Sequence, residues 1–194
     1  MRKDKCSLAI FASGNGSNAE AIINYLEESK NLEVTAIYSN NPSAYVLQRA
    51  KNHGITSHVF KRAEFYDSSY LQKIMAEDFD LIVLAGFMWL IPETLVQAYP
   101  GRIINIHPAL LPKFGGKGMY GHHVHEAVLK QDEKESGITI HFVNEQYDEG
   151  DIILQKSCAV LPGDSPDLLA SRIHALEHEY YPKVIKEICQ KILA

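Results

Sequence analysis

Residues 7–18 read SLAIFASGNGSN, an apolar run that leads directly into a cluster of glycine, asparagine and serine. A short apolar run bounded by turn-forming residues is typical of a buried strand. Just downstream, apolar residues between Ile22 and Leu26 recur at helical spacing, which predicts a helix from about Asn18 to Ser29. The stretch therefore predicts a strand, a tight turn and a helix, the first unit of an α/β fold.

The same alternation continues along the first half of the chain. Short runs rich in β-branched residues are separated by turn signals and by stretches with helical spacing. Because such strand–helix units connect by right-handed crossovers, we expect a mostly parallel, twisted sheet with helices on both faces. The expected strands are residues 33–38, 59–60, 80–85 and 102–106, and the expected helices lie around Val46–Ala50 and Tyr70–Met75.

The second half of the chain has a different pattern. Residues 137–142, GITIHF, alternate apolar and polar side chains, and residues 151–160 form a second extended run. These two runs predict an antiparallel extension of the sheet. From Ser165 to Ile188 the apolar residues keep a helical spacing, which predicts a long closing helix.

The composition is that of an ordinary globular domain. With 194 residues, 46% of them hydrophobic, the chain can bury a sizeable core, so we expect residues 1–194 to form one domain. The net charge of −5 argues against nucleic-acid binding, and no apolar run reaches the roughly 20 residues that span a membrane. Three widely spaced cysteines and an N-terminus unlike a signal peptide favour a cytoplasmic location.

The loop Gly14–Asn18, GNGSN, is the first candidate site. Its glycines let backbone N–H groups approach an anion, and the start of the following helix offers unpaired donors and a partial positive charge. The loop does not match the dinucleotide fingerprint, because Ala19 stands where a third glycine is expected. We weigh phosphate binding against an ordinary turn in which Ser17 or Asn18 caps the helix.

The second candidate site is Asn105-Ile106-His107-Pro108, at the end of a predicted strand, where ligands gather in open α/β sheets. Alternation along the strand puts Asn105 and His107 on one face. An amide donor beside an imidazole can stabilise an oxyanion and move a proton. The structural alternative is that Asn105 caps the strand and His107 makes one hydrogen bond in the core.

An acidic segment, residues 144–151, is the third candidate site. A cluster of carboxylates in a connection is usually a solvated turn. The functional alternative places Asp148 beside His107, where its charge would hold the tautomer of the ring and favour the imidazolium.

Three histidines, His122, His123 and His125, follow a glycine-rich segment that starts at Phe114. We expect no metal here, because no cysteine or second histidine cluster has ligand spacing. These histidines are expected to line a pocket or to be exposed. The glycine-rich segment is either a mobile surface loop or part of a site.

Several of these motifs occur together in one known family. The segments FASGNGSN (11–18), LAGFMWLIP (84–92), INIHPALLPKF (104–114), GITIHFVNEQYDEGDIILQ (137–155) and HALEHEYYP (174–182) closely resemble the phosphoribosylglycinamide formyltransferases, folate-dependent enzymes of purine synthesis. The resemblance covers about residues 7–188. The Asn-Ile-His-Pro element with a downstream aspartate is common to the wider formyltransferase superfamily, whereas GNGSN and HALE narrow the acceptor to glycinamide ribonucleotide.

The resemblance implies a Rossmann-like formyltransferase fold, with residues 1–100 as the nucleotide-binding half and 101–194 as the catalytic and folate-binding half. The catalytic set that it implies is Asn105, His107 and Asp148. For the ribonucleotide it implies Gly16, Ser17 and Asn18 at the phosphate and Glu177 at the amino end. For the folate it implies Met88, Trp89, Leu90, Ile91, Asn105, Asn144, Glu145, Gln146, Tyr147 and Asp148.

The chain departs from the family pattern at two places. The family commonly has a folate-contacting arginine after the third strand, whereas residues 65–69, FYDSS, offer none in register; Lys61 and Arg62 lie just upstream. The loop from Phe114 to His123 is longer and richer in glycine than the family's version. It therefore stays open whether His123 or His125 faces the active site.

The expected activity is transfer of a formyl group from 10-formyltetrahydrofolate, as co-substrate, to the amine of 5'-phosphoribosylglycinamide, without metal. The expected partners are these small molecules, with no nucleic acid or membrane, in a monomer or homodimer. The alternatives are a formyltransferase or deformylase acting on initiator tRNA or water, and a non-catalytic module that uses only the GNGSN loop. The first would normally carry a further domain, and the second leaves Asn105, His107 and Asp148 unexplained.

Overall fold

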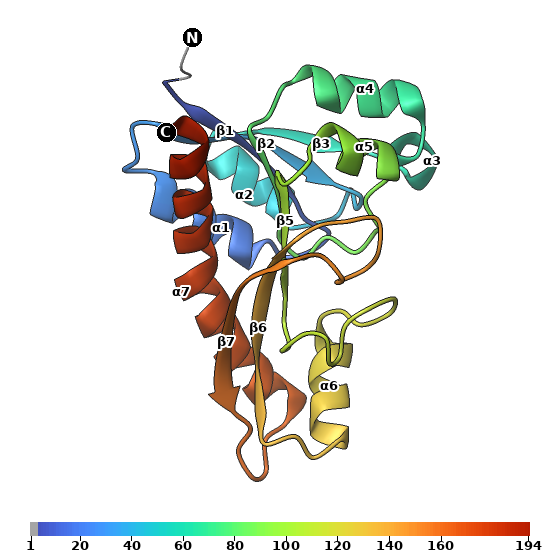
Figure 1. Ribbon diagram of the computed structural model, residues 1–194, viewed down its shortest axis with the longest axis vertical. Helices are drawn as coiled ribbons and strands as arrows, with labels where there is room; N and C mark the ends of the chain where they lie inside the picture. Colours follow the sequence, from blue (N-terminus) through green and yellow to red (C-terminus); the bar gives the residue numbers. More distant parts are fainter. Residues whose placement is uncertain (1–3) are drawn as a thin grey trace.

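The computed structural model describes residues 4–194, whose strands form one sheet in the order β3-β2-β1-β4-β5-β6-β7 (Figure 1). Strands β1 to β5 run parallel, β6 is added antiparallel to β5, and β7 is added antiparallel to β6. This confirms the mostly parallel sheet with an antiparallel extension. The strands are β1 Cys6–Phe11, β2 Leu32–Ser39, β3 Thr56–Val59, β4 Leu81–Leu84, β5 Ile103–His107, β6 Glu135–Phe142 and β7 Ile152–Ala159.

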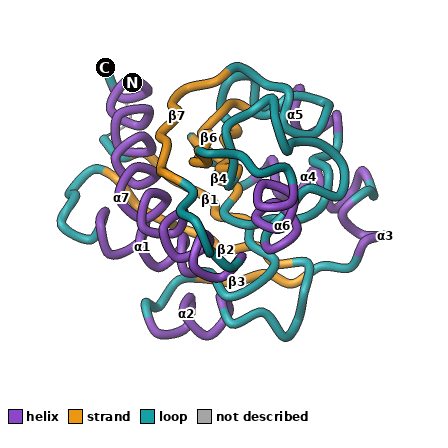
Figure 2. Tube along the Cα trace, turned by 90° about the horizontal axis from the view of Figure 1, so that it is seen from below, coloured by secondary structure: helices purple, strands orange, loops and turns teal. Residues whose placement is uncertain are grey.

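Helices cover both faces of this sheet. Figure 2 shows α1, α2 and α7 on one side of the strands and α3, α4 and α5 on the other. The helices are α1 Ser17–Leu26, α2 Val46–Asn52, α3 Arg62–Phe65, α4 Ser68–Ala76, α5 Glu93–Ala98, α6 His122–Lys130 and α7 Pro166–Leu193. The long closing helix and the helices at α1, α2 and α4 are confirmed. The helices α3, α5 and α6 were not predicted. The helices α3 and α5 are too short to show an apolar repeat, and α6 begins with polar histidines and has few apolar residues.

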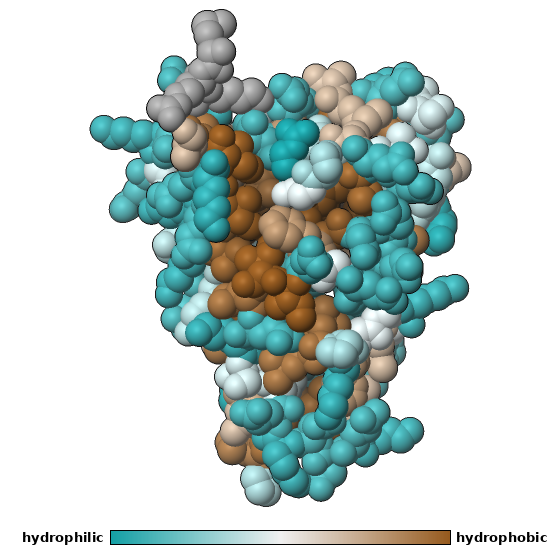
Figure 3. All heavy atoms as spheres, viewed as in Figure 1, coloured by the Kyte–Doolittle hydropathy of each residue, from teal (hydrophilic) through white to brown (hydrophobic). Residues whose placement is uncertain are grey.

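Two hydrophobic cores lie on the two faces of the sheet. One joins Ile22 of α1 and Ile173 of α7 to the strands. The other packs Phe65, Ile74 and Leu95 from α3, α4 and α5 against the opposite face. On the side seen in Figure 3, hydrophobic side chains gather along the middle of the molecule and hydrophilic ones around its edge. Within residues 4–194, no helix is both long and apolar enough to cross a bilayer.

The order of the strands indicates where a ligand can bind. The chain runs from β1 outward to β2 and β3 and then returns to pair β4 with the other side of β1. The loops that leave the carboxyl ends of β1 and β4 therefore diverge, which opens a crevice at this edge of the sheet. The long helix α7 packs against α1 and β6, so that it closes one side of the crevice.

Tyr181 fixes α7 to the strands that carry this crevice. Its side chain is fully buried, and its hydroxyl donates toward the carbonyl oxygens of Leu84 (3.0 Å) and Ile104 (3.2 Å). Since Leu84 ends β4 and Ile104 lies in β5, one hydroxyl joins three elements. Burial raises the pKa of Tyr181, so the phenol stays a hydrogen-bond donor at all working pH values.

We expect Tyr181→Phe to lower the free energy of unfolding by about 1 kcal/mol, because the change removes a buried donor and keeps the ring. Urea unfolding of the purified protein measures this difference. Tyr25→Phe is the matched control, since Tyr25 is 42% exposed and its ring packs under Lys186. Equal stability of Tyr181→Phe and the wild type would show that the hydroxyl contributes nothing to the docking of α7.

Candidate active site

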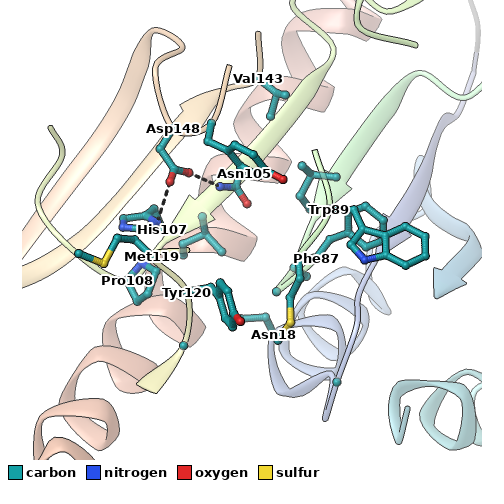
Figure 4. A pocket seen from close by; sticks show the side chains of 18 of the residues that line it. Asn18, Phe87, Trp89, Asn105, His107, Pro108, Met119, Tyr120, Val143 and Asp148 are labelled. Carbon is teal, nitrogen blue, oxygen red and sulfur yellow. Dashed lines mark hydrogen bonds and ion pairs between the residues drawn. The ribbon is translucent and has the colours of Figure 1, made fainter. Parts of the chain in front are cut away.

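A cavity of about 700 Å³ opens at the carboxyl ends of the parallel strands (Figure 4). The GNGSN loop after β1, the segment after β4 and the end of β5 form its walls, together with the glycine-rich loop before α6 and the loop after β6. His174 and Glu177 of α7 complete it. The cavity therefore brings all three candidate sites into one space.

The GNGSN loop ends on Gly16, which caps α1 with a φ of 75°. Neither Ser17 nor Asn18 caps the helix, so the structural alternative for this loop was wrong; no side-chain hydrogen bond caps α1 within residues 4–194. Asn18 instead donates from its Nδ2 to Oε2 of Glu177 at 2.9 Å. The first N–H groups of α1 thus face the cavity, which is the arrangement that binds anions.

Residues of α2 hold the GNGSN loop from behind. The backbone N–H of Val46 donates to the carbonyl of Gly14 at 3.2 Å. Arg49 donates to the carbonyl and the side-chain oxygen of Asn15, each at 2.9 Å, and forms an ion pair with Glu20 at 3.2 Å. The loop is therefore fixed before any ligand binds, which reduces the entropy lost on binding.

Asn105 and His107 both face the cavity, as the alternation along β5 predicted. His107 is 3% exposed, its Nε2 lies 2.7 Å from the carbonyl oxygen of Phe114, and its Nδ1 lies 3.5 Å from Oδ2 of Asp148. Burial lowers the pKa of His107, against the opposing effects of Asp148 and the Phe114 carbonyl. The charge of Asp148 raises the pKa of His107, as expected, but the opposite effect of burial is larger.

Asp148 occupies a left-handed backbone conformation, with a φ of 59°, that aims its carboxylate inward. Its Oδ2 accepts the N–H of Gly116 at 2.9 Å, and its Oδ1 accepts from Nδ2 of Asn105 at 3.4 Å. Burial would raise the pKa of Asp148, but His141, His107 and the Gly116 N–H together hold it below its ordinary value. The group is therefore a carboxylate at neutral pH, held by the N–H of Gly116 and the amide of Asn105.

His141 is a residue of this site that sequence reasoning missed. It lies opposite Asn105 in the antiparallel β5–β6 pair, is 2% exposed and lines the cavity. Its Nε2 is 3.1 Å from Nδ2 of Asn105 and 3.6 Å from Oδ1 of Asp148. The alternating pattern of residues 137–142 put His141 with Thr139 on the polar face of the strand, and only the structure shows that this face of β6 is buried as well.

Comparison with known proteins assigns the family. Residues 6–185 match the family model described as formyl transferase, which is nearly the whole chain. The chain belongs to the formyl transferase family. Phosphoribosylglycinamide formyltransferase of Bacillus subtilis is 40% identical over 186 residues, which cover 93% of each chain. A chloroplastic phosphoribosylglycinamide formyltransferase of Arabidopsis thaliana is 43% identical, and the match spans 65% of that longer protein.

Solved structures share the fold of this formyl transferase. A glycinamide ribonucleotide transformylase from Symbiobacterium toebii superimposes with a TM-score of 0.87 at 33% identity, covering 97% of this chain and 89% of the other. A phosphoribosylglycinamide formyltransferase from Streptococcus pneumoniae gives a TM-score of 0.83 at 37% identity, covering 94% and 98%. The expected formyltransferase fold is thereby confirmed.

One wall of the formyl transferase cavity is apolar. Met88, Trp89, Leu90 and Ile91 all line it, with Met88 48% exposed and Ile91 buried. Trp89 lies edge-on to Phe60 and Phe87 in an aromatic cluster. This wall can cover the face of a flat heterocycle. Hydrogen bonds from the Met88 N–H to Ser13 Oγ and from the Tyr66 hydroxyl to the Leu90 carbonyl hold its backbone in place.

The loop after β6 contributes less than the resemblance implied. Gln146, Tyr147 and Asp148 line the cavity, but Asn144 and Glu145 do not. Asn144 instead accepts the N–H of Gln146 on its Oδ1 at 3.0 Å, a local turn that shapes the loop.

The glycine-rich loop is part of the site, because residues 116–121 line the cavity. Of the three histidines, His125 faces the cavity and is 2% exposed, while His122 and His123 are exposed beside Glu126. Burial, with smaller effects of neighbouring histidines, lowers the pKa of His125 to about 4. Within residues 4–194, no three His, Cys, Asp or Glu side chains cluster as metal ligands would.

An arginine does reach the apolar wall, although none stands in the family's register. The guanidinium of Arg62, in α3, lies 5.6 Å from the centroid of the Trp89 ring and 5.7 Å from that of Tyr66. Because α3 was not predicted, no sequence pattern placed Arg62 beside the 88–91 segment.

Proposed function

We propose that this formyl transferase moves the formyl group of 10-formyltetrahydrofolate to the amine of 5'-phosphoribosylglycinamide, in purine synthesis. The observation that carries the proposal is a single cavity that joins a helix N-terminus suited to phosphate with an amide, an imidazole and a carboxylate. Relatives that are similar over 93% of both chains are named for this reaction.

The ribonucleotide occupies the end of the cavity at α1. Its phosphate accepts the backbone N–H groups of Gly16, Ser17 and Asn18. Glu177 meets the glycinamide amino end. Burial raises the pKa of this carboxyl, although a hydrogen bond from Asn18 opposes the effect. A polar group of the substrate would therefore give the buried carboxyl a further partner. In this arrangement residues 1–100 bind the phosphate and cover one side of the folate, and residues 101–194 supply the catalytic groups, Glu177 and the other side of the folate site.

The folate occupies the other end, with its pterin between the Met88–Ile91 wall and the Gln146–Asp148 loop. Arg62 beside Trp89 offers a cation to the acidic tail of the folate. Asn144 and Glu145 support the loop from outside the cavity. Both substrates then meet at Asn105 and His107.

Attack of the glycinamide amine on the formyl carbon gives a tetrahedral oxyanion. Asn105 and His107 stabilise this charge, and one such donor typically contributes about 3 kcal/mol. His107 is largely neutral in the free site because burial lowers its pKa. The developing oxyanion adds a second negative charge to that of Asp148, so the imidazolium is favoured in the transition state, where it lowers the barrier.

Two proton movements complete the reaction. The amine loses a proton, and the folate nitrogen gains one as its bond to the formyl carbon breaks and the carbonyl re-forms; Asp148 organises a water that carries the proton. The chemistry requires no metal and no covalent enzyme intermediate, and holding the substrates in line supplies much of the remaining acceleration.

The direct test mixes the purified protein with both substrates and follows loss of the formyl donor by absorbance, with mass spectrometry of the formylated product. We expect turnover that depends on both substrates. Loss of the donor without the ribonucleotide would instead identify a deformylase, and folate binding without turnover would identify a binding module. A cytoplasmic location and a monomeric or dimeric state remain predictions, to be checked by fractionation and light scattering.

We expect Gly16→Ala to raise the KM for the ribonucleotide more than about tenfold. A Cβ at Gly16 would lie 2.5 Å from Cγ2 of Val46, and a φ of 75° is strained for alanine, so the loop must move. Steady-state kinetics with each substrate varied in turn measures the effect, and the KM for the folate should stay within about twofold.

Gly101→Ala is the matched control for this loop variant. Gly101 also has a positive φ, of 65°, but a Cβ there meets nothing within 4 Å. It should therefore lose some stability and keep both KM values. An unchanged ribonucleotide KM in Gly16→Ala would remove the GNGSN loop from phosphate binding.

A further inference from the structure

We propose that His141 is a positioning residue that orients the amide of Asn105, so that one N–H of the amide points at the formyl oxygen. The inference rests on the proposed function, because it assigns Asn105 the stabilisation of the oxyanion. Neither the resemblance nor the alternation of the strand gave His141 any role. Three observations carry it: the tautomer of the ring, the positions of three polar atoms, and the pairing of two strands.

The tautomer of His141 follows from its neighbour along the chain. Its Nδ1 lies 2.7 Å from the carbonyl oxygen of Phe142, which can only accept a hydrogen bond. Nδ1 therefore carries a proton, and Nε2 of the neutral ring presents a lone pair. That lone pair lies 3.1 Å from Nδ2 of Asn105, so His141 accepts a hydrogen bond from the amide.

The positions of the acceptors show which end of the Asn105 amide faces His141 and Asp148. Nδ2 of Asn105 is 3.1 Å from Nε2 of His141 and 3.4 Å from Oδ1 of Asp148, and these two acceptors are 3.6 Å apart. The three atoms form a nearly equilateral triangle, whose angle at the amide nitrogen is far smaller than the roughly 120° between two amide N–H bonds. Both acceptors thus lie at the nitrogen end of the amide, and the proposed role requires that one N–H serve them while the other points toward the substrate.

His141 fixes which end of the amide faces which neighbour. An amide turned over would set its oxygen against the Nε2 lone pair and the Asp148 carboxylate, which both repel it. The ring of His141 cannot move to accommodate a flipped amide, because it is 2% exposed and the β5–β6 register holds it opposite Asn105. The orientation of the donor is thus set before substrate binds, which is how an oxyanion site lowers a barrier.

A pair of substitutions separates this role from simple packing. The Oε1 of a glutamine can take the place of Nε2 and accept the Asn105 N–H, whereas an asparagine ends near Nδ1 and cannot reach. We expect His141→Asn to lower kcat more than tenfold, with both KM values within about twofold of the wild type. His141→Gln should recover most of the loss, and His123→Asn, at an exposed histidine, should behave as the wild type.

A double-mutant cycle keeps the test decisive even if the variants lose some stability. In an Asn105→Ala background, His141→Asn should cause less than a twofold further loss of kcat, because the group it orients is gone. Equal losses in both backgrounds, or a wild-type kcat for His141→Asn, would overturn the assignment. A wild type that does not transfer formyl groups would instead refute the proposed function, which distinguishes the two failures.

Discussion

His107→Ala is expected to lower kcat by at least about a hundredfold while the protein stays folded. The imidazole is 3% exposed, lies at the end of β5 and faces the cavity beside Asp148. Loss of one oxyanion donor costs about 3 kcal/mol, which corresponds to about two powers of ten in rate. The loss should fall on kcat more than on KM, because the interaction strengthens as the oxyanion develops.

Steady-state kinetics with both substrates measures this effect, and circular dichroism with thermal unfolding confirms the fold. The matched control is His123→Ala, which removes an imidazole whose side chain is 61% exposed and outside the cavity. Turnover within about threefold of the wild type in His107→Ala would remove His107 from the chemistry.

Asp148→Asn has the second large expected effect, on kcat and on the pH at which His107 titrates. The carboxylate of Asp148 raises the pKa of His107, while burial lowers it and prevails. Without the negative charge only the Phe114 carbonyl opposes the effect of burial, so the pKa of His107 falls further. Activity that needs the imidazolium is present below that pKa and lost above it; the alkaline decline of kcat should therefore move to lower pH.

Two measurements follow this shift: the pH profile of kcat, and the titration of the His107 ring by NMR in the free protein. We expect kcat at neutral pH to fall at least about tenfold, because a smaller fraction of the enzyme carries a protonated His107. Asp151→Asn, an exposed carboxylate of the same connection, is the control and should leave both profiles unchanged. A His107 titration that stays in place or moves upward in Asp148→Asn would exclude Asp148 from this role.

The part of the fold that was predictable is the part encoded by local burial. The run at β4 is buried throughout and the run at β1 is buried except at Ser7, so they read as strands of a parallel sheet. The helix α7 repeats one apolar face over many turns. By contrast, α5 is too short and α6 too rich in polar residues for such a repeat to stand out, and their helical state depends on what they pack against.

The candidate site was predictable only where neighbours in sequence are also neighbours in space. Asn105 and His107 are two residues apart on one strand, so their shared face follows from the geometry of a strand. His123 and His125 are equally close, yet only the packing of α6 shows that His125 is the buried one. The capping of α1 by Gly16 likewise depends on a backbone angle that no side chain reveals.

The sequence alone determined an α/β domain with a glycine turn before its first helix and an Asn–His pair at the end of an inner strand, because these features arise from periodicities of a few residues. The tertiary structure decided that Asp148 and His141, 43 and 36 residues after Asn105, meet that amide. Such contacts depend on which strands pair and in what register. That choice minimises the free energy of the whole core, and no local pattern contains it.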